Sequence, residues 1–347
     1  MNKNKDAEVE WLIEHLLHLM KEKKIGKTFI ENFSMPTIYS KKRLLLRRIT
    51  DTMKPYKYSP QFIDRLNNLL QTEREDPILL TQIPPTQLHT MFSKNIHLFQ
   101  GDITTLKVDA IVNAANSTLL GCFIPNHSCI DSIIHAKAGV QMRYECSTLP
   151  TAGKAKVGSA VSTKGYNLPA KYVIHTVGPA VGVLHPHHFY ELQQCYLNSL
   201  HLAFSLGCES IAFCCISTGF FGFPNEEAAM VAIQSINSFF KIHKNITLSV
   251  VFVTFSKLDH SLYQTDLEMG FDELKIPTKS EYDAEMKEIA KIKSTAKKSD
   301  DEVEESGTNT HLSDDGAEKK QNEHKEVKLK TPKVRSQSLD KWFVKKS

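Results

Sequence analysis

The sequence predicts an α/β fold in which helices cover a largely buried mixed or parallel sheet. From about residue 95 onward, short runs of β-branched and aromatic residues alternate with longer segments of helical periodicity. This alternation is typical of sheets whose strands are connected by helices. With 347 residues, of which 41% are hydrophobic, the chain is long enough to bury a substantial core.

Residues 1–90 predict a helical extension that packs on this core. Apolar side chains recur at three-and-four spacing over residues 9–20 and 62–70, and a further apolar run lies at Leu44–Leu46. This is the spacing of one helix face, so each segment is expected to be a helix. Three prolines between residues 77 and 85 interrupt regular structure before the α/β domain, which is expected over 91–275.

The α/β domain is predicted to contain six strands and four helices. The strands are Ile96–Phe99, Ala110–Asn113, Ser159–Ser162, Tyr172–Val177, Ile211–Ile216 and Leu248–Phe255. The helices are Cys129–Ala138, Phe189–Ser205, Asn225–Lys241 and Lys257–Met269. Ligands of open α/β sheets bind at the carboxyl ends of strands, so the loops 113–116 and 217–224 are expected to line one cleft.

Residues 276–347 predict a disordered charged tail. They are rich in Lys, Glu, Asp and Ser and carry too few large apolar side chains to repay the entropy of ordering. Apolar residues return near the end of the chain in the spacing of a sliding-clamp-binding peptide, at Ser336, Leu339, Trp342 and Phe343. The usual first-position glutamine of that peptide is absent. The basic residues just before it are either a nuclear-import signal or a solvated basic run.

Composition points to a soluble intracellular protein that is cytoplasmic, nuclear or both. The chain has no apolar run long enough to span a membrane, and its first residues are polar and acidic. Seven cysteines, an odd number scattered along the chain, fit a reducing compartment better than a disulfide framework. The formal charge of +4 is too small to indicate direct nucleic-acid binding.

Three soft metal-ligand candidates lie in one short loop, at Cys122, His127 and Cys129. Thiolate and imidazole suit zinc, and a catalytic zinc takes three protein ligands and keeps a fourth position open. The spacing alone is a weak signal. The alternative is a bent loop with two reduced cysteines and a surface histidine. His135 and His175 are expected to be structural, and the histidines at 185, 187 and 188 to lie in a solvated loop.

Five ordered motifs resemble the macrodomain family, in particular its zinc-containing branch. They are GDIT at 101–104, VDAIVNAAN at 108–116, LLGCFIPNHSCID at 119–131, YNLPAKYVIHTVGP at 166–179 and CISTGFFGFPNEEAA at 215–229. The resemblance covers roughly residues 95–270. It implies a three-layer α/β/α fold with a mixed central sheet that binds ADP-ribose. The loop that carries Cys122, His127 and Cys129, called the metal loop below, replaces the glycine-rich ligand loop of ordinary macrodomains. This implies one zinc ion per chain.

The resemblance also assigns roles at three strand ends. Asp102 would accept from the adenine amine, and Ile103 would add backbone and apolar contact; the alternative for Asp102 is an ordinary turn or cap. Asn116 would contact the distal ribose, unless it is a turn residue, and Asn113 would hold the loop by bonding its own backbone. The diphosphate would lie on the loop Ser217, Thr218, Gly219, Phe220, Phe221 and Gly222. Phe221 would cover the distal ribose, the alternative being that both phenylalanines are buried.

Asp131 and Asn116 are the catalytic candidates. The resemblance implies that Asp131 orients the attacking water, but Ser128 and Asp131 also have the spacing of a capping box. The resulting hypothesis is a zinc-dependent hydrolase that removes mono-ADP-ribose from modified proteins, with an ester to Asp or Glu as the preferred linkage. Zinc would act as a Lewis acid or activate bound water. The alternative is a reader that binds ADP-ribose without cleavage and carries a structural zinc.

Overall fold

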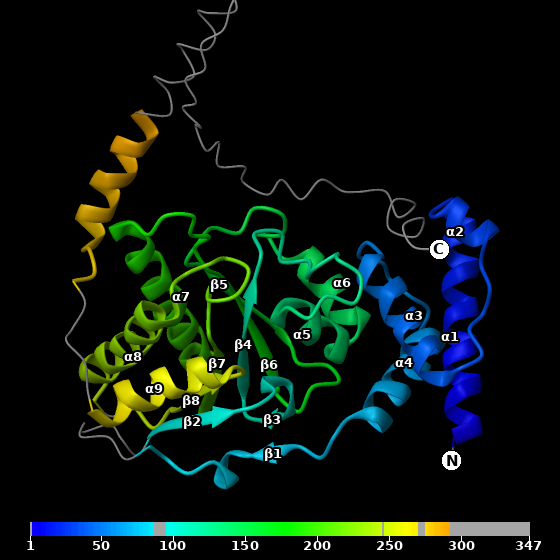
Figure 1. Cartoon of the computed structure of the whole chain (residues 1–347), viewed down its shortest axis with the longest axis horizontal. Coiled ribbons are helices and arrows are strands. Elements are labelled where there is room, and N and C mark those ends of the chain that lie inside the picture. Colours follow the sequence, from blue (N-terminus) through cyan, green and yellow to red (C-terminus); the bar gives the residue numbers. More distant parts are fainter. Residues whose placement is uncertain (1, 87–94, 245, 270–274, 292–347) are drawn as a thin grey trace, which may run out of the picture.

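The computed structural model describes residues 2–86, 95–244, 246–269 and 275–291, which form a helical extension beside an α/β domain (Figure 1). The extension contains α1 (Asn2–Glu22), α2 (Lys27–Glu31), α3 (Tyr39–Thr52) and α4 (Pro60–Glu73). The apolar faces of these helices share one buried cluster: Val9, Leu12, Ile13, Leu16, Leu19, Met20, Leu46, Ile49, Met53, Tyr58, Phe62, Leu66 and Leu69. The helices predicted from apolar spacing are therefore confirmed.

The α/β domain is built on a six-stranded sheet with the order β2-β8-β7-β4-β6-β5. The strands are β2 (Ile96–Gln100), β4 (Ala110–Ala115), β5 (Ala160–Lys164), β6 (Tyr172–Val177), β7 (Ser210–Cys214) and β8 (Ser249–Thr254). Neighbouring strands are parallel except for β5, which is antiparallel to β6. The predicted mixed sheet is thus confirmed. A separate two-stranded parallel sheet joins β1 (Ile78–Leu79) to β3 (Leu106–Lys107).

Helices flank the sheet on two sides (Figure 1). One group is α7 (Pro186–Ser205), α8 (Asn225–Ile242) and α9 (Lys257–Met269), and the other is α5 (Ile130–Ala138) and α6 (Val140–Thr148), on the side of the extension. Two 3₁₀ turns, η1 (Leu80–Gln82) and η3 (Ile103–Thr105), precede and follow β2. Helix α6 was missed from the sequence because its short segment, VQMRYECST, has only a weak apolar stripe.

The extension is tied to the α/β domain by side chains of α3 and α4. Helix α3 packs against α5. From α4, Asn67 Oδ1 accepts from Asn167 Nδ2 at 2.7 Å, and Gln71 Nε2 donates to Asn167 Oδ1 at 3.2 Å. Farther from the domain, Arg65 binds Glu8 through two bonds of 2.6 and 2.7 Å and stacks 3.9 Å from the centre of the Trp11 ring.

Residues 279–291 form a further helix, drawn in orange in Figure 1. Its Tyr282 ring stacks on Tyr190 of α7 with centroids 4.6 Å apart, and Glu285 Oε1 lies 2.8 Å from His187 Nδ1. The expectation of disorder from residue 276 is therefore wrong for this segment, because composition does not reveal these contacts. The expectation of a solvated histidine loop is also wrong for His187, which lies in α7 and is 13% exposed.

The rest of the predicted tail, including Ser336, Leu339, Trp342 and Phe343, lies outside the described residues. Among the helices that the structure describes, none combines the length and the apolar character needed to cross a bilayer.

Candidate functional site

The predicted site loops meet at one edge of the sheet. Because β2, β4, β6, β7 and β8 run parallel, their carboxyl ends point the same way. Asp102 follows β2, Asn116 follows β4, Gly178 follows β6 and Ser217 comes shortly after β7. This is the edge at which ligands of open α/β sheets bind.

The loop Ser217–Gly222 offers backbone donors at this edge. Phe223 N donates to Ser217 O at 2.9 Å and closes the loop. Within the described part of the chain, the N–H groups of residues 219–221 have no protein acceptor. Neighbouring N–H groups exposed in a tight turn form a concave site that attracts anions. The loop is therefore equipped to bind a phosphate group.

The side chains of this loop fit the same role. Ser217 has a φ of 67°, and its buried Oγ has no hydrogen-bond partner among the described residues. Phe220 is 75% exposed, and Phe221 is half-buried. The alternative that both phenylalanines are buried is therefore wrong, because the loop leaves the sheet edge at this point. Thr218 faces inward, where its hydroxyl donates to Cys215 O at 3.1 Å.

Replacing Gly178 with alanine is expected to distort this loop. A Cβ at Gly178 would lie 2.1 Å from Ser217 Oγ and 2.9 Å from Ile216 Cγ2. Overpacking of this kind costs about 1–3 kcal/mol of unfolding free energy. Denaturant unfolding measures the loss. Gly219→Ala is the matched control, since a Cβ there meets nothing within 4 Å; equal stability of the two variants would contradict the prediction.

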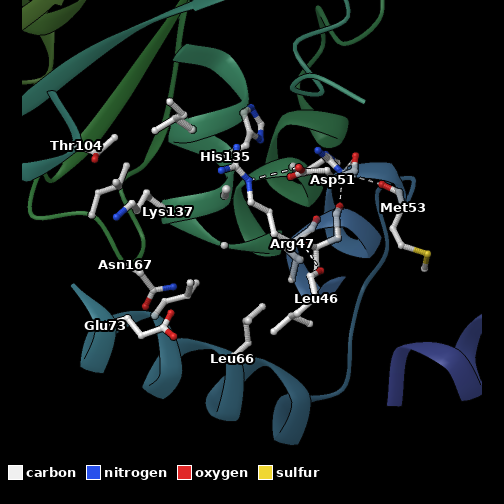
Figure 2. Close-up of a pocket in the computed structure, with 18 of the residues that line it drawn as sticks. Leu46, Arg47, Asp51, Met53, Leu66, Glu73, Thr104, His135, Lys137 and Asn167 are labelled. Carbon is white, nitrogen blue, oxygen red and sulfur yellow. Dashed lines mark hydrogen bonds and ion pairs between the residues drawn. The ribbon is translucent and has the colours of Figure 1, made fainter. Parts of the chain in front are cut away.

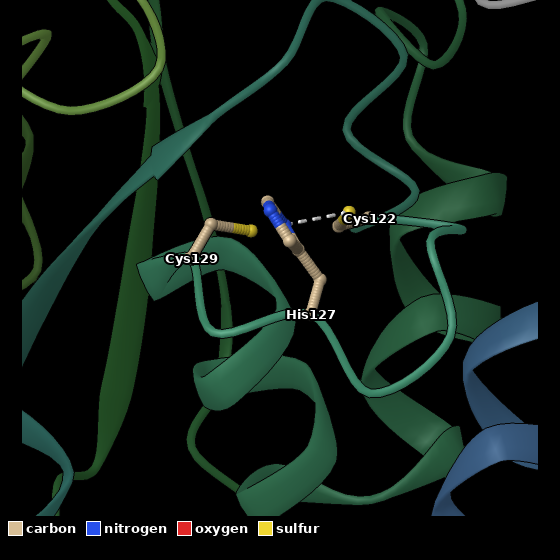
Figure 3. Close-up of side chains that lie close together, drawn as sticks. All are labelled: Cys122, His127 and Cys129. Atoms are coloured by element: carbon tan, nitrogen blue, oxygen red, sulfur yellow. Dashed lines mark hydrogen bonds between the residues drawn. The ribbon is translucent and has the colours of Figure 1, made fainter.

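Cys122, His127 and Cys129 converge as predicted (Figure 3). One potential ligand atom from each lies within 4.8 Å of the others, and Cys122 Sγ is 3.5 Å from His127 Nδ1. Zinc bonds of about 2.3 Å to sulfur and 2.0 Å to nitrogen separate these two ligands by roughly 3.5 Å in a tetrahedron. The donor set and its spacing therefore fit zinc with one position left for another ligand.

The two thiols of the loop differ in acidity. Hydrogen bonding from Cys129, a backbone donor at Ile124 and the neighbouring His127 ring lower the pKa of Cys122 to about 6. The same pairing, together with burial, raises the pKa of Cys129. The pairing thus favours the thiolate at Cys122, and thiolate is the form of cysteine that would bind a metal here.

Asp131 is buried beneath this loop, in the first turn of α5. Its Oδ1 accepts from Asn113 Nδ2 at 2.8 Å and its Oδ2 accepts from Asn116 Nδ2 at 3.1 Å. Burial raises the pKa of this carboxyl group to about 6. Asn113 therefore bonds side chains, not its own backbone as expected. The capping role with Ser128 is not seen, since the N-cap is Cys129 and has no side-chain cap bond.

The amide of Asn116 shapes the turn that leads into the metal loop. Its Nδ2 also donates to Gly121 O at 3.0 Å, and its Oδ1 accepts from Thr118 N at 2.9 Å. The side chain thus makes the bonds of a turn residue, although its φ is not in the left-handed region. Contact of Asn116 with a ribose stays a prediction.

Asp102 and Ile103 lie where β2 ends. Asp102 caps the η3 turn, because its Oδ1 accepts from Thr104 N at 2.8 Å and from Thr104 Oγ1 at 2.7 Å. The cap that was the alternative role is therefore present, and adenine recognition stays a prediction. The Ile103 side chain is 2% exposed and belongs to the main core, which leaves its backbone for ligand contact.

Two histidines support the site from below. His175 Nδ1 lies 3.1 Å from Asn113 Nδ2, and its Nε2 lies 2.9 Å from Thr163 Oγ1. Its structural role matches the expectation. His135 is also buried, but neither ring nitrogen has a hydrogen-bond partner among the described residues; Nε2 lies 3.5 Å from Asp131 Oδ1.

Burial of His175 predicts a loss of stability in acid. Burial lowers its pKa from 6.5 to about 4, so between these pH values the unfolded chain binds a proton that the folded chain does not. The free energy of unfolding therefore falls as pH drops through this window, by up to about 3 kcal/mol for this group. Urea titrations at several pH values measure the slope. His175→Gln should flatten it, and an unchanged slope would contradict the assignment.

The sequence did not reveal three residues that hold the metal loop. Arg47 and Asp51 come from α3 and Arg143 from α6. Arg47 Nη2 donates to His127 O at 2.7 Å, Asp51 Oδ2 accepts from Asn126 N at 2.9 Å, and Arg143 Nε donates to Leu120 O at 2.8 Å. For Arg47 and Asp51 the sequence signal was charge next to the apolar run at Leu44–Leu46, and Arg143 lies in α6, which the sequence did not reveal.

A cavity of about 160 Å³ lies between the extension and α5 (Figure 2). Its walls include Arg47, Asp51, His135 and Arg143 but none of the three metal-ligand candidates and no residue of the loop Ser217–Gly222. The cavity therefore lies behind the metal loop and is separate from the sheet-edge site.

Comparison with known proteins gives consistent matches. The Macro domain family model matches residues 112–232. A protein-ADP-ribose hydrolase of Treponema medium is 40% identical over 234 residues, which cover 66% of this chain and 88% of that protein. The protein-ADP-ribose hydrolase of Staphylococcus aureus strain Mu50 is 51% identical over 177 residues, 50% of this chain and 66% of that protein, just under two thirds of its length. The crystal structure of a Trypanosoma brucei macrodomain in complex with ADP-ribose aligns with a TM-score of 0.51 and 30% identity, covering 63% of this chain and 94% of that one.

Proposed function

This chain belongs to the macrodomain family, and from that premise we propose that it hydrolyses the bond between ADP-ribose and modified proteins. The observation that carries the proposal is the pairing of two features at one sheet edge. One is the loop Ser217–Gly222, whose N–H groups at residues 219–221 have no acceptor in the described part of the chain, and the other is the cluster of Cys122, His127 and Cys129. The relatives in Treponema medium and Staphylococcus aureus are named for this activity.

The loop Ser217–Gly222 would bind the diphosphate. Its N–H groups and the Ser217 hydroxyl, which has no partner among the described residues, are suitable donors to phosphate oxygens, and Phe221 would cover the distal ribose. Asp102 lies at the end of β2, where the second oxygen of its carboxylate would accept from the adenine amine. The ligand would therefore extend along the sheet edge from β2 toward the metal loop.

Cys122, His127 and Cys129 would hold one zinc ion. Bound there, zinc supplies a Lewis acid for a ribose or carbonyl oxygen, or lowers the pKa of a water ligand. The chain itself keeps the ligands in place: Asp131 fixes the amide of Asn116, and Asn116 fixes the turn at Gly121, one residue before Cys122. Asp131 would thus position Asn116 and the metal loop. To orient water as a base, its carboxylate would first have to break its hydrogen bond with Asn113 or Asn116.

The proposed substrate linkage is an ester between C1″ of the distal ribose and an aspartate or glutamate. Hydrolysis forms a bond from a water oxygen to C1″, breaks the bond from C1″ to the side-chain oxygen, and releases that side chain as a carboxylate. The water protons end on the ribose hydroxyl and in solvent. The loop Ser217–Gly222 would hold the ADP-ribose in place while the carboxylate leaves.

A reader that binds ADP-ribose without cleavage is the second candidate. One observation favours it: both oxygens of Asp131 and all hydrogen-bonding positions of the Asn116 amide are already used within the protein. A reader would bind ADP-ribose with the same loop and use zinc only to fix the loop.

The decisive experiment compares metal-replete and metal-stripped protein. Each is incubated with proteins modified separately at acidic residues, at serine and at arginine, and released ADP-ribose is measured. We expect release from the acidic linkage by metal-replete protein and a loss on stripping. Binding of ADP-ribose without release from any substrate would support the reader, and full activity after verified zinc loss would reject the role of zinc.

A further inference from the structure

The metal loop is held from behind by the helical extension. The loop runs from Gly121 to Cys129 without helix or strand, and Asn126 in it has a left-handed φ of 54°. One backbone hydrogen bond within the loop, from His127 N to Ile124 O, is long, at 3.3 Å. A loop with so little internal bonding depends on outside contacts to fix its ligands.

Two side chains of α3 supply those contacts at adjacent residues of the loop. Arg47 Nη2 donates to His127 O at 2.7 Å, and Asp51 Oδ2 accepts from Asn126 N at 2.9 Å. The two side chains also face each other, with Arg47 Nε 3.5 Å from Asp51 Oδ2. One ion pair therefore fixes both the carbonyl group of His127 and the N–H group of the residue before it.

The position of this pair makes it more than a surface contact. The Asp51 side chain is 3% exposed and that of Arg47 is 29% exposed. Arg47 Nη2 also lies 3.3 Å from Ser132 Oγ of α5, so the guanidinium joins the extension, the loop and the helix that follows the loop. Hydrogen bonds of charged groups in such partly buried places are stronger than neutral ones.

We infer that Arg47 and Asp51 are positioning residues for the proposed zinc site. This rests on the proposed function for the identity of the metal. Within the described residues, the hydrogen bonds from these two side chains to the loop go to its backbone and not to the ligand side chains. They fix the backbone on which His127 stands, so that its ring stays 3.5 Å from Cys122 Sγ before metal arrives. Without either contact the loop would become ordered only when zinc binds. The entropy lost in that ordering would lower the affinity for zinc.

The test measures zinc affinity of the full chain by competition with a chelator. Outer contacts that orient metal ligands typically contribute 10–100-fold in affinity, so Arg47→Gln and Asp51→Asn are each expected to weaken zinc binding about 10-fold. Arg47→Lys should recover part of the loss, since its ammonium can donate to His127 O. The double variant should lose less than the two single variants combined, because the two residues act together.

Arg65→Gln is the matched control. It removes an arginine–carboxylate pair of the same extension, with Glu8, far from the loop in sequence and contact. Its zinc affinity should equal that of the unchanged chain. Thermal unfolding of each metal-stripped variant separates loop positioning from general destabilisation. If Arg47→Gln does not fold, the near-isosteric Asp51→Asn carries the test.

Failure of this inference is distinguishable from failure of the proposed function. If the unchanged chain binds no zinc, the metal part of the proposed function fails. If it binds zinc, and Arg47→Gln and Asp51→Asn bind with the affinity of Arg65→Gln, the positioning role is overturned while the zinc site stands.

Discussion

Replacing Cys122 with alanine is expected to weaken zinc binding at least about 100-fold. Structural zinc sites hold the ion by about 10–16 kcal/mol through four ligands, or about 3 kcal/mol for each. In a site of three protein ligands, the loss of one leaves only two to hold the ion. Cys122 is also the thiol of the pair whose pKa is lowered, to about 6, so alanine removes the side chain that most readily forms a thiolate ligand.

Metal analysis after dialysis and chelator competition measure this loss. The control is Cys208→Ala, which removes a buried thiol at the residue before Glu209 and β7, outside the metal loop. Full zinc occupancy of Cys122→Ala would remove Cys122 from the ligand set. If ADP-ribose release falls with zinc while binding of free ADP-ribose survives, the reader hypothesis is rejected.

Replacing Arg143 with methionine is expected to cost about 3–5 kcal/mol of unfolding free energy. Its Nη1 donates to three carbonyl oxygens of residues 50–53 at 2.7–2.9 Å, and its Nε donates to Leu120 O at 2.8 Å. The side chain is 7% exposed, so water cannot replace these bonds easily. Methionine keeps the apolar volume but removes the Arg143 donor from four carbonyl oxygens, two of them in buried bonds and two in partly buried ones.

Urea unfolding of metal-stripped protein isolates this effect from zinc binding. Arg65→Met is the control, because Arg65 is 31% exposed and, among the described residues, forms its ion pair with Glu8 of the extension; its loss should be about 1 kcal/mol. Arg143→Lys should fall between the two, since an ammonium can reach only part of the carbonyl set. Equal losses for Arg143→Met and Arg65→Met would contradict the role assigned to Arg143.

The parts of the fold that depend on local pattern could be predicted from the sequence. Strand β6 and helix α9 begin and end at the expected residues, Tyr172–Val177 and Lys257–Met269. Their apolar runs are long and their boundaries are marked by turn residues. Helix α6 lacks such a stripe, and the 279–291 helix draws its order from contacts with α7, so neither could be found by periodicity.

The candidate site also has parts that local sequence pattern predicts and parts that it does not. The metal candidates lie within eight residues, from Cys122 to Cys129, and their convergence follows from spacing and family motif. Arg47 and His127 are 80 residues apart in the sequence, so no local pattern could predict the hydrogen bond between them. The Asn113 amide was expected to bond its own backbone but donates to Asp131. Asn113 is a buried residue of β4, so its side chain lies in the core and not along the loop.

The stack of Arg65 on Trp11 gives the protein a built-in fluorescent reporter. The chain has two tryptophans, Trp11 in α1 and Trp342, so the described α/β domain contains none. In a Trp342→Phe background, emission from Trp11 follows the extension alone, while circular dichroism of the whole chain also follows the domain. Coincident transitions would mean that both parts unfold as one cooperative unit. Zinc held at the proposed site of the α/β domain should then raise the midpoint of the Trp11 signal.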